Sequence, residues 1–172
     1  KDYQVIAQAA TYFYEFNHTA APFNNVKLRK ALAMAIDKKK LVELVTRGGQ
    51  IATDAVTPAV PGYVPPKGNA YNVEAAKKLL AEAGYPGGKG FPGATILYNT
   101  SEGHKKIAEY IQQQWSQNLN LQVDIENAEW KTVLDRGKNQ DFQILRMGWI
   151  GDYQDPNTFL ELFQTDAGQN YG

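Results

Sequence analysis

The sequence contains no cysteine, which excludes disulfide bonds, thiolate catalysis and zinc sites with thiolate ligands. It also lacks an excess of charge of either sign, with 18 basic and 18 acidic residues. Because a nucleic-acid-binding domain normally carries a basic surplus, we expect no nucleic-acid partner. No run approaches the roughly 18 consecutive apolar residues of a membrane-spanning helix. The first residues, KDYQVIAQAA, do not have the pattern of a secretion signal and read like the middle of a domain.

Residues and motifs that enzymes commonly use are scarce. Only His18 and His104 are available as imidazole bases, and neither G-x-S-x-G nor H-E-x-x-H occurs. Asp152 with Asp155 or Glu129 has the composition of a glycosidase carboxylate pair. Asp155, however, directly precedes PNTFLELF and is better explained as the N-cap of a helix. We therefore expect a protein that is not an enzyme and that has neither a cofactor nor a metal site.

The first third of the chain predicts strand, then helices, within a composition typical of one globular domain. Residues 5–16, VIAQAATYFYEF, favour one or two strands, whose close aromatics we assign to core and sheet packing rather than to a ligand platform. Asn24 or Asn25 then offers an N-cap. The first predicted helix has an inward apolar stripe at helical spacing: Leu28, Ala31, Leu32 and Ala35. A second short helix is predicted to begin after a cap at Asp37 and to end near Gly48. Its inward residues are Leu41, Val42, Leu44 and Val45.

The middle of the chain alternates between irregular and helical patterns. Residues 52–69 are crowded with proline and glycine, which prevent regular structure, yet are apolar enough to predict an ordered loop packed on the domain. Asn72 then caps a helix that ends at Gly84. Its inward stripe consists of Ala76, Leu79, Leu80 and Ala83.

The second half repeats a strand and helix plan. We expect strands over 94–99, 121–126 and 142–147, separated by helices over 101–118 and 129–135. Alternating strands and helices with short joins predict an α/β fold whose strands are parallel. The carboxyl ends of these strands then share one edge of the sheet, at residues 99–104, 127–130 and 148–155. Such an edge is where α/β proteins usually bind a ligand.

The stretch from Gln143 to Phe159, QILRMGWIGDYQDPNTF, concentrates chemistry at that edge. It begins as a buried strand and then presents a cation, an indole, a phenol and carboxylates before the next helix: Arg146, Trp149, Asp152, Tyr153 and Asp155. Together with the other two strand ends, this stretch predicts a ligand-binding site.

RMGWIGDYQDPNTF resembles the segment R-x-G-W-x-x-D-Y-x-[DE]-P of the periplasmic oligopeptide-binding proteins, family 5 of the bacterial solute-binding proteins. Further matching segments occur in the same order over nearly the whole chain: TYFYEFN (11–17), PFNNVKLRKALAMAID (22–37), AAKKLLAEAGYP (75–86), GKGFP (88–92), YNTSEGHKKIAE (98–109) and EWK (129–131). The resemblance implies a periplasmic-binding-protein-like lobe with a central sheet flanked by helices. It covers part of a larger two-lobed receptor, so residues 1–172 are expected to be a fragment that forms one ligand-binding lobe.

The resemblance also implies ligand-binding roles for particular residues. It assigns to Asp152 the grip on a peptide's α-ammonium, a pairing that charge-assisted hydrogen bonds make strong. Without the family, Asp152 would be read as a loop aspartate that caps backbone groups. Arg146 and His104 match residues that meet the peptide carboxylate in ligands of different length. His104 would otherwise be read as a surface histidine near the start of its helix.

Aromatic residues complete the expected site. Trp130 and Trp149 match residues that line roomy side-chain pockets, where flat rings accept varied side chains. Tyr153 is expected to support either the pocket wall or the ligand. Trp115 lies on the buried stripe of its helix, and we assign it to the core. The implied partners are short peptides and the membrane permease of a peptide ABC transporter.

The resemblance further implies a monomer that is periplasmic, or extracytoplasmic and membrane-anchored. Two alternatives remain. Relatives with this fold bind murein peptides, haem, nickel complexes or sugars, and such a ligand without a free amine would leave Asp152 without a role. The other alternative is a chaperone-like adaptor that has no transport role.

Overall fold

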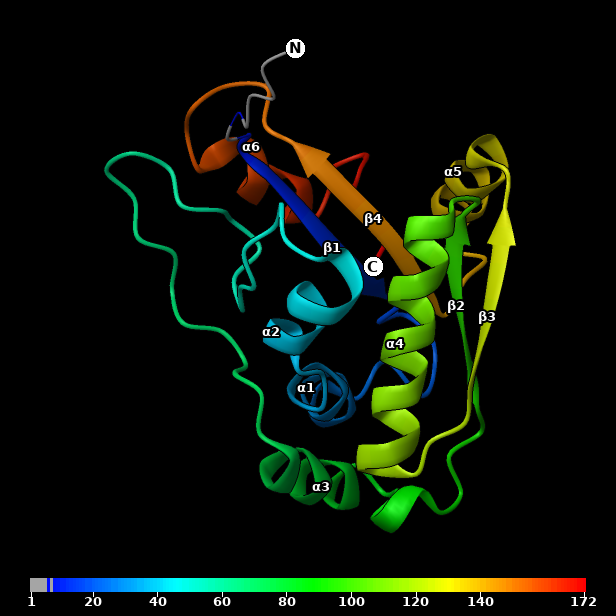
Figure 1. Cartoon of the computed structure of the whole chain (residues 1–172). Coiled ribbons are helices and arrows are strands. Elements are labelled where there is room, and N and C mark those ends of the chain that lie inside the picture. Colours follow the sequence, from blue (N-terminus) through cyan, green and yellow to red (C-terminus); the bar gives the residue numbers. More distant parts are fainter. Residues whose placement is uncertain (1–5, 7) are drawn as a thin grey trace.

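The computed structural model describes residue 6 and residues 8–172. Within them the strands β1 (Ala10–Phe16), β2 (Ala94–Asn99), β3 (Val123–Ala128) and β4 (Ile144–Ile150) form one sheet in the order β1-β4-β2-β3. Strand β2 is parallel to both β3 and β4, whereas β1 is antiparallel to β4. In Figure 1 the arrowheads of β2, β3 and β4 point the same way, and β1 runs beside β4. The predicted α/β class and the parallel strands are confirmed.

Helices cover both faces of this sheet. One face packs on α1 (Val26–Met34), α3 (Val73–Glu82) and the long α4 (Glu102–Leu119), and the other on α5 (Trp130–Lys138). The first core is the larger and includes Leu28, Leu32, Leu80, Ile96, Ile111, Trp115 and Ile144. The second consists of Leu97, Val133, Phe142, Leu145, Met147 and Tyr171. Alternate residues of the strands point to opposite faces, so a single strand supplies both cores.

Side-chain caps fix where several helices begin, as predicted. The side chain of Asn25 accepts a hydrogen bond from the backbone N–H of Lys27, and the side chain of Asn72 accepts one from the N–H of Ala75. Each bond satisfies one of the backbone donors that a helix start leaves without a partner. The stripe Leu28, Ala31, Leu32 and Ala35 is fully buried, as expected. Trp115 is also buried, and its ring N–H donates to the carbonyl of Leu32 at 2.9 Å.

The helix after Asp37 differs from the prediction. Asp37 does accept the N–H of Lys40, but α2 (Lys38–Lys40) passes at once into η1 (Leu41–Thr46), a π-helical segment with wider turns. Wider turns shift the phase of the side chains. Leu41 and Val45 therefore still pack on the core, whereas Leu44 is 60% exposed and its predicted inward position is wrong.

Other sequence-based boundaries need smaller corrections. The predicted strand over 5–16 begins at Ala10, and residues 1–5 and 7 lie outside the described part. The two later strands start and end two or three residues further along than expected. The prediction of a packed loop over 52–69 holds only around Thr57 and Val60, which are buried. Most of the remaining loop is exposed, including Val64 at 88%, because no helix or strand lies over it.

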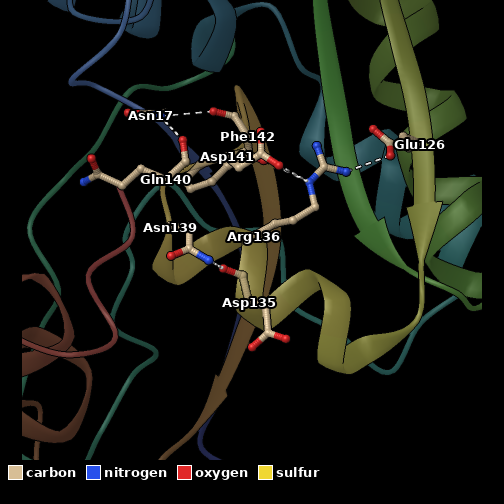
Figure 2. A network of polar contacts seen from close by, with 8 residues as sticks. All are labelled: Asn17, Glu126, Asp135, Arg136, Asn139, Gln140, Asp141 and Phe142. Atoms are coloured by element: carbon tan, nitrogen blue, oxygen red, sulfur yellow. Dashed lines mark hydrogen bonds and ion pairs between the residues drawn. The ribbon is translucent and has the colours of Figure 1, made fainter.

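A polar network ties the start of β4 to the end of β1 (Figure 2). Asn17 is buried, and its amide donates to the carbonyls of Gln140 and Phe142 at 3.0 and 3.1 Å. Arg136, to which the sequence assigned no role, forms ion pairs with Glu126 at 2.7 Å and Asp141 at 3.2 Å. These bonds hold the turn before β4, and thereby fix where the later residues of that strand lie.

The last elements follow the far end of β4. The short helix α6 (Asn157–Leu160) continues into the 3-10 helix η3 (Glu161–Phe163). Another 3-10 helix, η2 (Pro86–Gly88), lies earlier in the chain, just before β2. The carboxylate of Asp155 accepts a hydrogen bond from the N–H of Asn157 at 2.8 Å, so it satisfies a donor at the start of α6, although Pro156, and not Asp155 as predicted, occupies the N-cap position. None of the helices in the described part of the chain is long and apolar enough to cross a membrane.

Candidate functional site

The carboxyl ends of β2, β3 and β4 meet at one edge of the sheet, as their parallel pairing requires. Side chains near the end of β4 separate there onto two faces. Arg146 lies on the face of α4, and Met147 and Trp149 lie on the face of α5. The predicted site residues therefore belong to two cavities, one on each face of the sheet.

The first cavity is rich in cationic groups. It has a volume of about 480 Å³ and is lined by residues of β1, β4, η1, the start of α4 and the loops around them: Tyr12, Val45, Thr46, Gln50, Ser101, Gly103, His104, Lys106, Ile107 and Arg146. It brings together Arg146 and His104, which are 42 residues apart in sequence. None of these lining residues is Asp or Glu, and Arg146 forms no ion pair with a described carboxylate. The cavity therefore favours an anionic group.

Arg146 is held from several sides. Its Nη1 donates to Oδ1 of Asn99 at 3.0 Å, and its guanidinium carbon lies 4.3 Å from the centroid of the Tyr12 ring. This distance is within the range of a cation–π interaction. The Nε of Arg146 is buried and has no hydrogen-bond partner among the described residues. Part of the donor capacity of this guanidinium thus remains unused inside the protein.

His104 adjoins the same tyrosine. The Nδ1 of His104 lies 3.3 Å from the Tyr12 hydroxyl, and the two rings lie 5.6 Å apart between centroids. Partial burial and the nearby Arg146 charge lower the pKa of His104 below its usual value. Burial also raises the pKa of Tyr12, an effect that the Arg146 charge partly opposes. At neutral pH the imidazole is accordingly neutral beside a permanently charged guanidinium.

The second cavity lies on the opposite face and is largely aromatic and apolar. It has a volume of about 250 Å³, and its lining is Trp130, Leu134, Lys138, Met147, Gly148, Trp149, Gln169 and Tyr171. Trp130 is the first residue of α5 and is 44% exposed, which is unusual for such a large apolar side chain. The two tryptophans that the resemblance placed in a side-chain pocket thus lie in one cavity.

Asp152 and Tyr153 lie in the loop after β4, and neither lines one of these two cavities. The side chain of Asp152 is exposed, while its backbone N–H donates to Oγ1 of Thr158 at 3.1 Å. The Tyr153 hydroxyl accepts from the amide of Asn157 at 3.0 Å and lies 3.4 Å from a Glu161 carboxylate oxygen. Tyr153 therefore braces α6 in this structure.

Thr158 organises this loop, although no sequence pattern marks it as a functional residue. It is completely buried, and its Oγ1 also lies 3.4 Å from the ring nitrogen of Trp149. Gly151 allows the close approach, because a Cβ there would lie 3.0 Å from the Phe159 ring and 3.1 Å from the Thr158 methyl group. One hydroxyl thus links the indole of the second cavity to the backbone of Asp152.

Tyr12 is the second residue that sequence reasoning missed. We assigned the aromatics of the first strand to core and sheet packing, and this holds for Tyr12, Tyr14, Phe16 and Phe13, each of which packs against one of the two cores. Tyr12 in addition lines the first cavity. Its place on the same face as Arg146 follows from strand pairing, which sets Tyr12 opposite Gly148. Only knowledge of which strands pair reveals this contact.

No group of three or more metal-binding side chains occurs within residue 6 and residues 8–172. The site is therefore best described as two cavities and an acidic loop at one sheet edge. Its chemistry is cationic and hydrogen-bonding on one face and aromatic on the other.

Comparison with known proteins gives a consistent result. The model of the bacterial extracellular solute-binding proteins, family 5 Middle, matches residues 1–171. The chain is 40% identical to the oligopeptide-binding protein OppA of Bacillus subtilis strain 168 over 170 residues, which are 94% of this chain and 31% of that relative. Other relatives are named for binding murein peptide in Escherichia coli and haem in Haemophilus influenzae.

Solved structures agree with the sequence comparison. A periplasmic oligopeptide-binding protein of Borrelia burgdorferi superposes with a TM-score of 0.89 and 45% identity, over 95% of this chain and 33% of that one. OppA of Haemophilus influenzae in complex with the peptide RPPGFSPFR gives a TM-score of 0.87 and 34% identity, over 95% of this chain and 34% of that one. The chain thus spans about a third of the length of these relatives. It belongs to family 5 of the bacterial extracellular solute-binding proteins.

Proposed function

We propose that residues 1–172 are one ligand-binding lobe of an extracytoplasmic receptor that captures short peptides in extended form and delivers them to the permease of an ABC transporter. The observation that carries this proposal is the first cavity, where Arg146 and His104 meet without an acidic lining residue. A free peptide always ends in a carboxylate, which is the anion that a guanidinium binds best.

The cavity accounts for carboxylate binding in physical terms. The Arg146 guanidinium is always charged and already held by Asn99 and Tyr12, so little conformational freedom is lost when an anion binds. His104 adds a neutral donor whose pKa an incoming carboxylate would raise. Ligands of different length would place their carboxylates nearer one or the other of these two groups.

Asp152 is proposed to hold the opposite end of the peptide. Its carboxylate is exposed, and none of the described hydrogen bonds or ion pairs involves it. The carboxylate is thus available for an α-ammonium, while the backbone of the residue is fixed by Thr158. When a second lobe closes over the ligand, water is excluded and the ion pair strengthens. The length of the relatives, about three times that of this chain, supports a receptor with such a further lobe.

The second cavity is proposed to receive a peptide side chain. Trp130 and Trp149 supply flat apolar walls, and Lys138 and Gln169 supply polar groups at the rim. Such a lining accepts varied side chains by dispersion without requiring one shape. Tyr153 is proposed to contribute to the pocket wall, or to the ligand when α6 moves. The output of the receptor is binding and not chemistry, so no catalytic residue is proposed.

The test is calorimetric titration of the full-length receptor with a tetrapeptide and its N-acetylated form. We expect Asp152→Ala to weaken binding of the free-amine peptide by about 2–5 kcal/mol, because the buried ammonium would lose its partner. Binding of the acetylated form should already be weak in the wild type. Asp152→Asn should resemble Asp152→Ala.

Asp155→Asn is the matched control, since it removes the same charge from the same loop but keeps an oxygen for the N–H of Asn157. An affinity of Asp152→Ala within threefold of wild type would reject the assignment of the amine to Asp152. Failure of both peptides to bind would reject the peptide ligand itself. Cell fractionation tests the proposed location, since the receptor should be found in the periplasmic or the membrane fraction.

A further inference from the structure

Tyr12 contacts both Arg146 and His104 in the first cavity. Its ring lies 4.3 Å from the guanidinium carbon of Arg146, and its hydroxyl lies 3.3 Å from Nδ1 of His104. These contacts join three elements, β1, β4 and α4. A single side chain thus determines the relative placement of the two groups that we propose for the ligand carboxylate.

Arg146 needs such support because its side chain has many rotamers. Ordering a long side chain costs up to about 2 kcal/mol, and that cost reduces affinity unless it has been met before the ligand arrives. The Tyr12 ring and Asn99 Oδ1 each restrict the guanidinium. The absence of a side chain at Gly148 leaves room for the Arg146 guanidinium. A Cβ at Gly148 would lie 3.4 Å from Nη2 of Arg146 and 3.3 Å from the carbonyl oxygen of Thr11.

The hydroxyl of Tyr12 has a separate effect on His104. A neutral imidazole carries its proton on only one ring nitrogen. When the tyrosine O–H donates to Nδ1, the proton of the imidazole resides on Nε2, and Nε2–H is then a donor for a ligand. Without the hydroxyl, neither the ring orientation nor this tautomer is fixed by the protein.

We propose that Tyr12 is a positioning residue that holds Arg146 and His104 in one arrangement competent to bind a ligand carboxylate. Its ring orders the guanidinium, and its hydroxyl orders the imidazole. The proposal rests on the proposed function, because it assumes that an anionic peptide terminus occupies the first cavity.

Tyr14 provides the control for a role in packing alone. It lies two residues along β1 on the same face, with its ring centroid 5.9 Å from that of Tyr12. Its hydroxyl is also buried but has no partner among the described residues. Tyr14→Phe therefore removes a hydroxyl from the same sheet face, beside Arg146 on the neighbouring strand, without removing a hydrogen bond to Arg146 or His104.

The experiment measures the affinity of the full-length receptor for tri- and tetrapeptides, each with a free carboxyl terminus and with a carboxyl-terminal amide. The readout is the ratio of the two affinities, which reports on the carboxylate alone. A general loss of packing would weaken both forms equally and leave the ratio unchanged. Four proteins are compared: wild type, Tyr12→Phe, Tyr12→Leu and Tyr14→Phe.

We expect Tyr12→Phe to lower the ratio by about threefold to tenfold, the effect of one lost hydrogen bond, for the peptide length whose carboxylate reaches His104. The other length should keep its ratio, since the ring beside Arg146 remains. Tyr12→Leu should lower the ratio for both lengths. Tyr14→Phe should match the wild type.

Distinct outcomes separate the two levels of the proposal. A wild-type receptor that binds acid and amide equally overturns the carboxylate assignment of the proposed function, and this inference with it. A wild type that prefers the acid, combined with an unchanged ratio in Tyr12→Phe, overturns only the role of Tyr12. Tyr12→Phe preserves the ring and the fold, so the test does not depend on whether Tyr12→Leu folds.

Discussion

At the residue scale, Glu15 is a carboxylic acid in an unusual, buried environment. It lies on β1 facing the second core and is 7% exposed, and its Oε2 has no partner among the described residues. Burial raises the pKa of Glu15 to about 7, while a hydrogen bond with the Tyr171 backbone partly opposes the rise. A carboxyl group in an apolar site favours its neutral form, because the charged form loses its hydration.

The raised pKa predicts how stability depends on pH. The folded protein binds more protons than the unfolded chain between the ordinary glutamate pKa of 4.5 and the raised pKa of about 7, so stability falls as pH rises through this window. The full loss above pH 7 is about 3 kcal/mol. Glu15→Gln should remove this dependence and be more stable than wild type at pH 8, with little difference near pH 4.5.

Urea denaturation at several pH values measures the Glu15 effect. Glu43→Gln, which alters an exposed carboxylate, is the control and should follow the wild-type profile. Parallel profiles of wild type and Glu15→Gln between pH 4.5 and 8 would show that Glu15 is ionised without cost in the folded protein.

At the scale of elements, β4 does most to shape the site. Its alternating side chains send Arg146 to the first cavity and Trp149 to the second. Its position is set at the other end, where Asn17 bonds the turn that precedes it (Figure 2). A shift of this strand by one residue would exchange the two faces, so its register is under strong constraint.

Asn17→Ala is expected to destabilise the protein by about 1–3 kcal/mol, because it leaves the buried carbonyl of Phe142 and the part-buried carbonyl of Gln140 without this donor. Chemical denaturation measures the change in unfolding free energy. Asn139→Ala serves as the matched control, since Asn139 is exposed and makes one side-chain bond to Asp135. Its cost should stay within about 0.5 kcal/mol. Equal effects of the two substitutions would remove the special role of Asn17.

At the scale of the whole molecule, the sheet separates the two cavities, which lie on its opposite faces. No lining residue is shared between them, and a packed core lies on each face. Substitutions at separated sites with no shared partners usually have additive effects. The two cavities are therefore expected to contribute separately to peptide binding.

Double-mutant cycles on a tetrapeptide test this independence. The binding costs of His104→Ala and Trp130→Ala, on opposite faces, should add to within about 0.5 kcal/mol. The costs of Tyr12→Leu and His104→Ala should not add, because these residues are in contact. A coupling across the sheet as large as that within the first cavity would contradict two separate cavities.

Local features of the sequence were sufficient for much of the fold. The N-caps Asn25 and Asn72 depend on hydrogen bonds within one helical turn, and both are present as predicted. Parallel strands follow from short helical crossovers. Leu44 was misplaced because nothing local announces a π-helical turn, and Val64 because the pattern of a loop does not reveal which surfaces lie beside it.

The sequence by itself determined the α/β class, the family and the sheet edge at which Arg146, Trp149 and Asp152 gather, since these depend on periodicity and on short motifs. Only the tertiary structure decided that Arg146 and His104 share one cavity while the tryptophans share another on the opposite face. It also decided that Tyr12 contacts both Arg146 and His104. Such neighbours are 42 and 92 residues apart in the chain, and their contact depends on strand order and register, which no local pattern encodes.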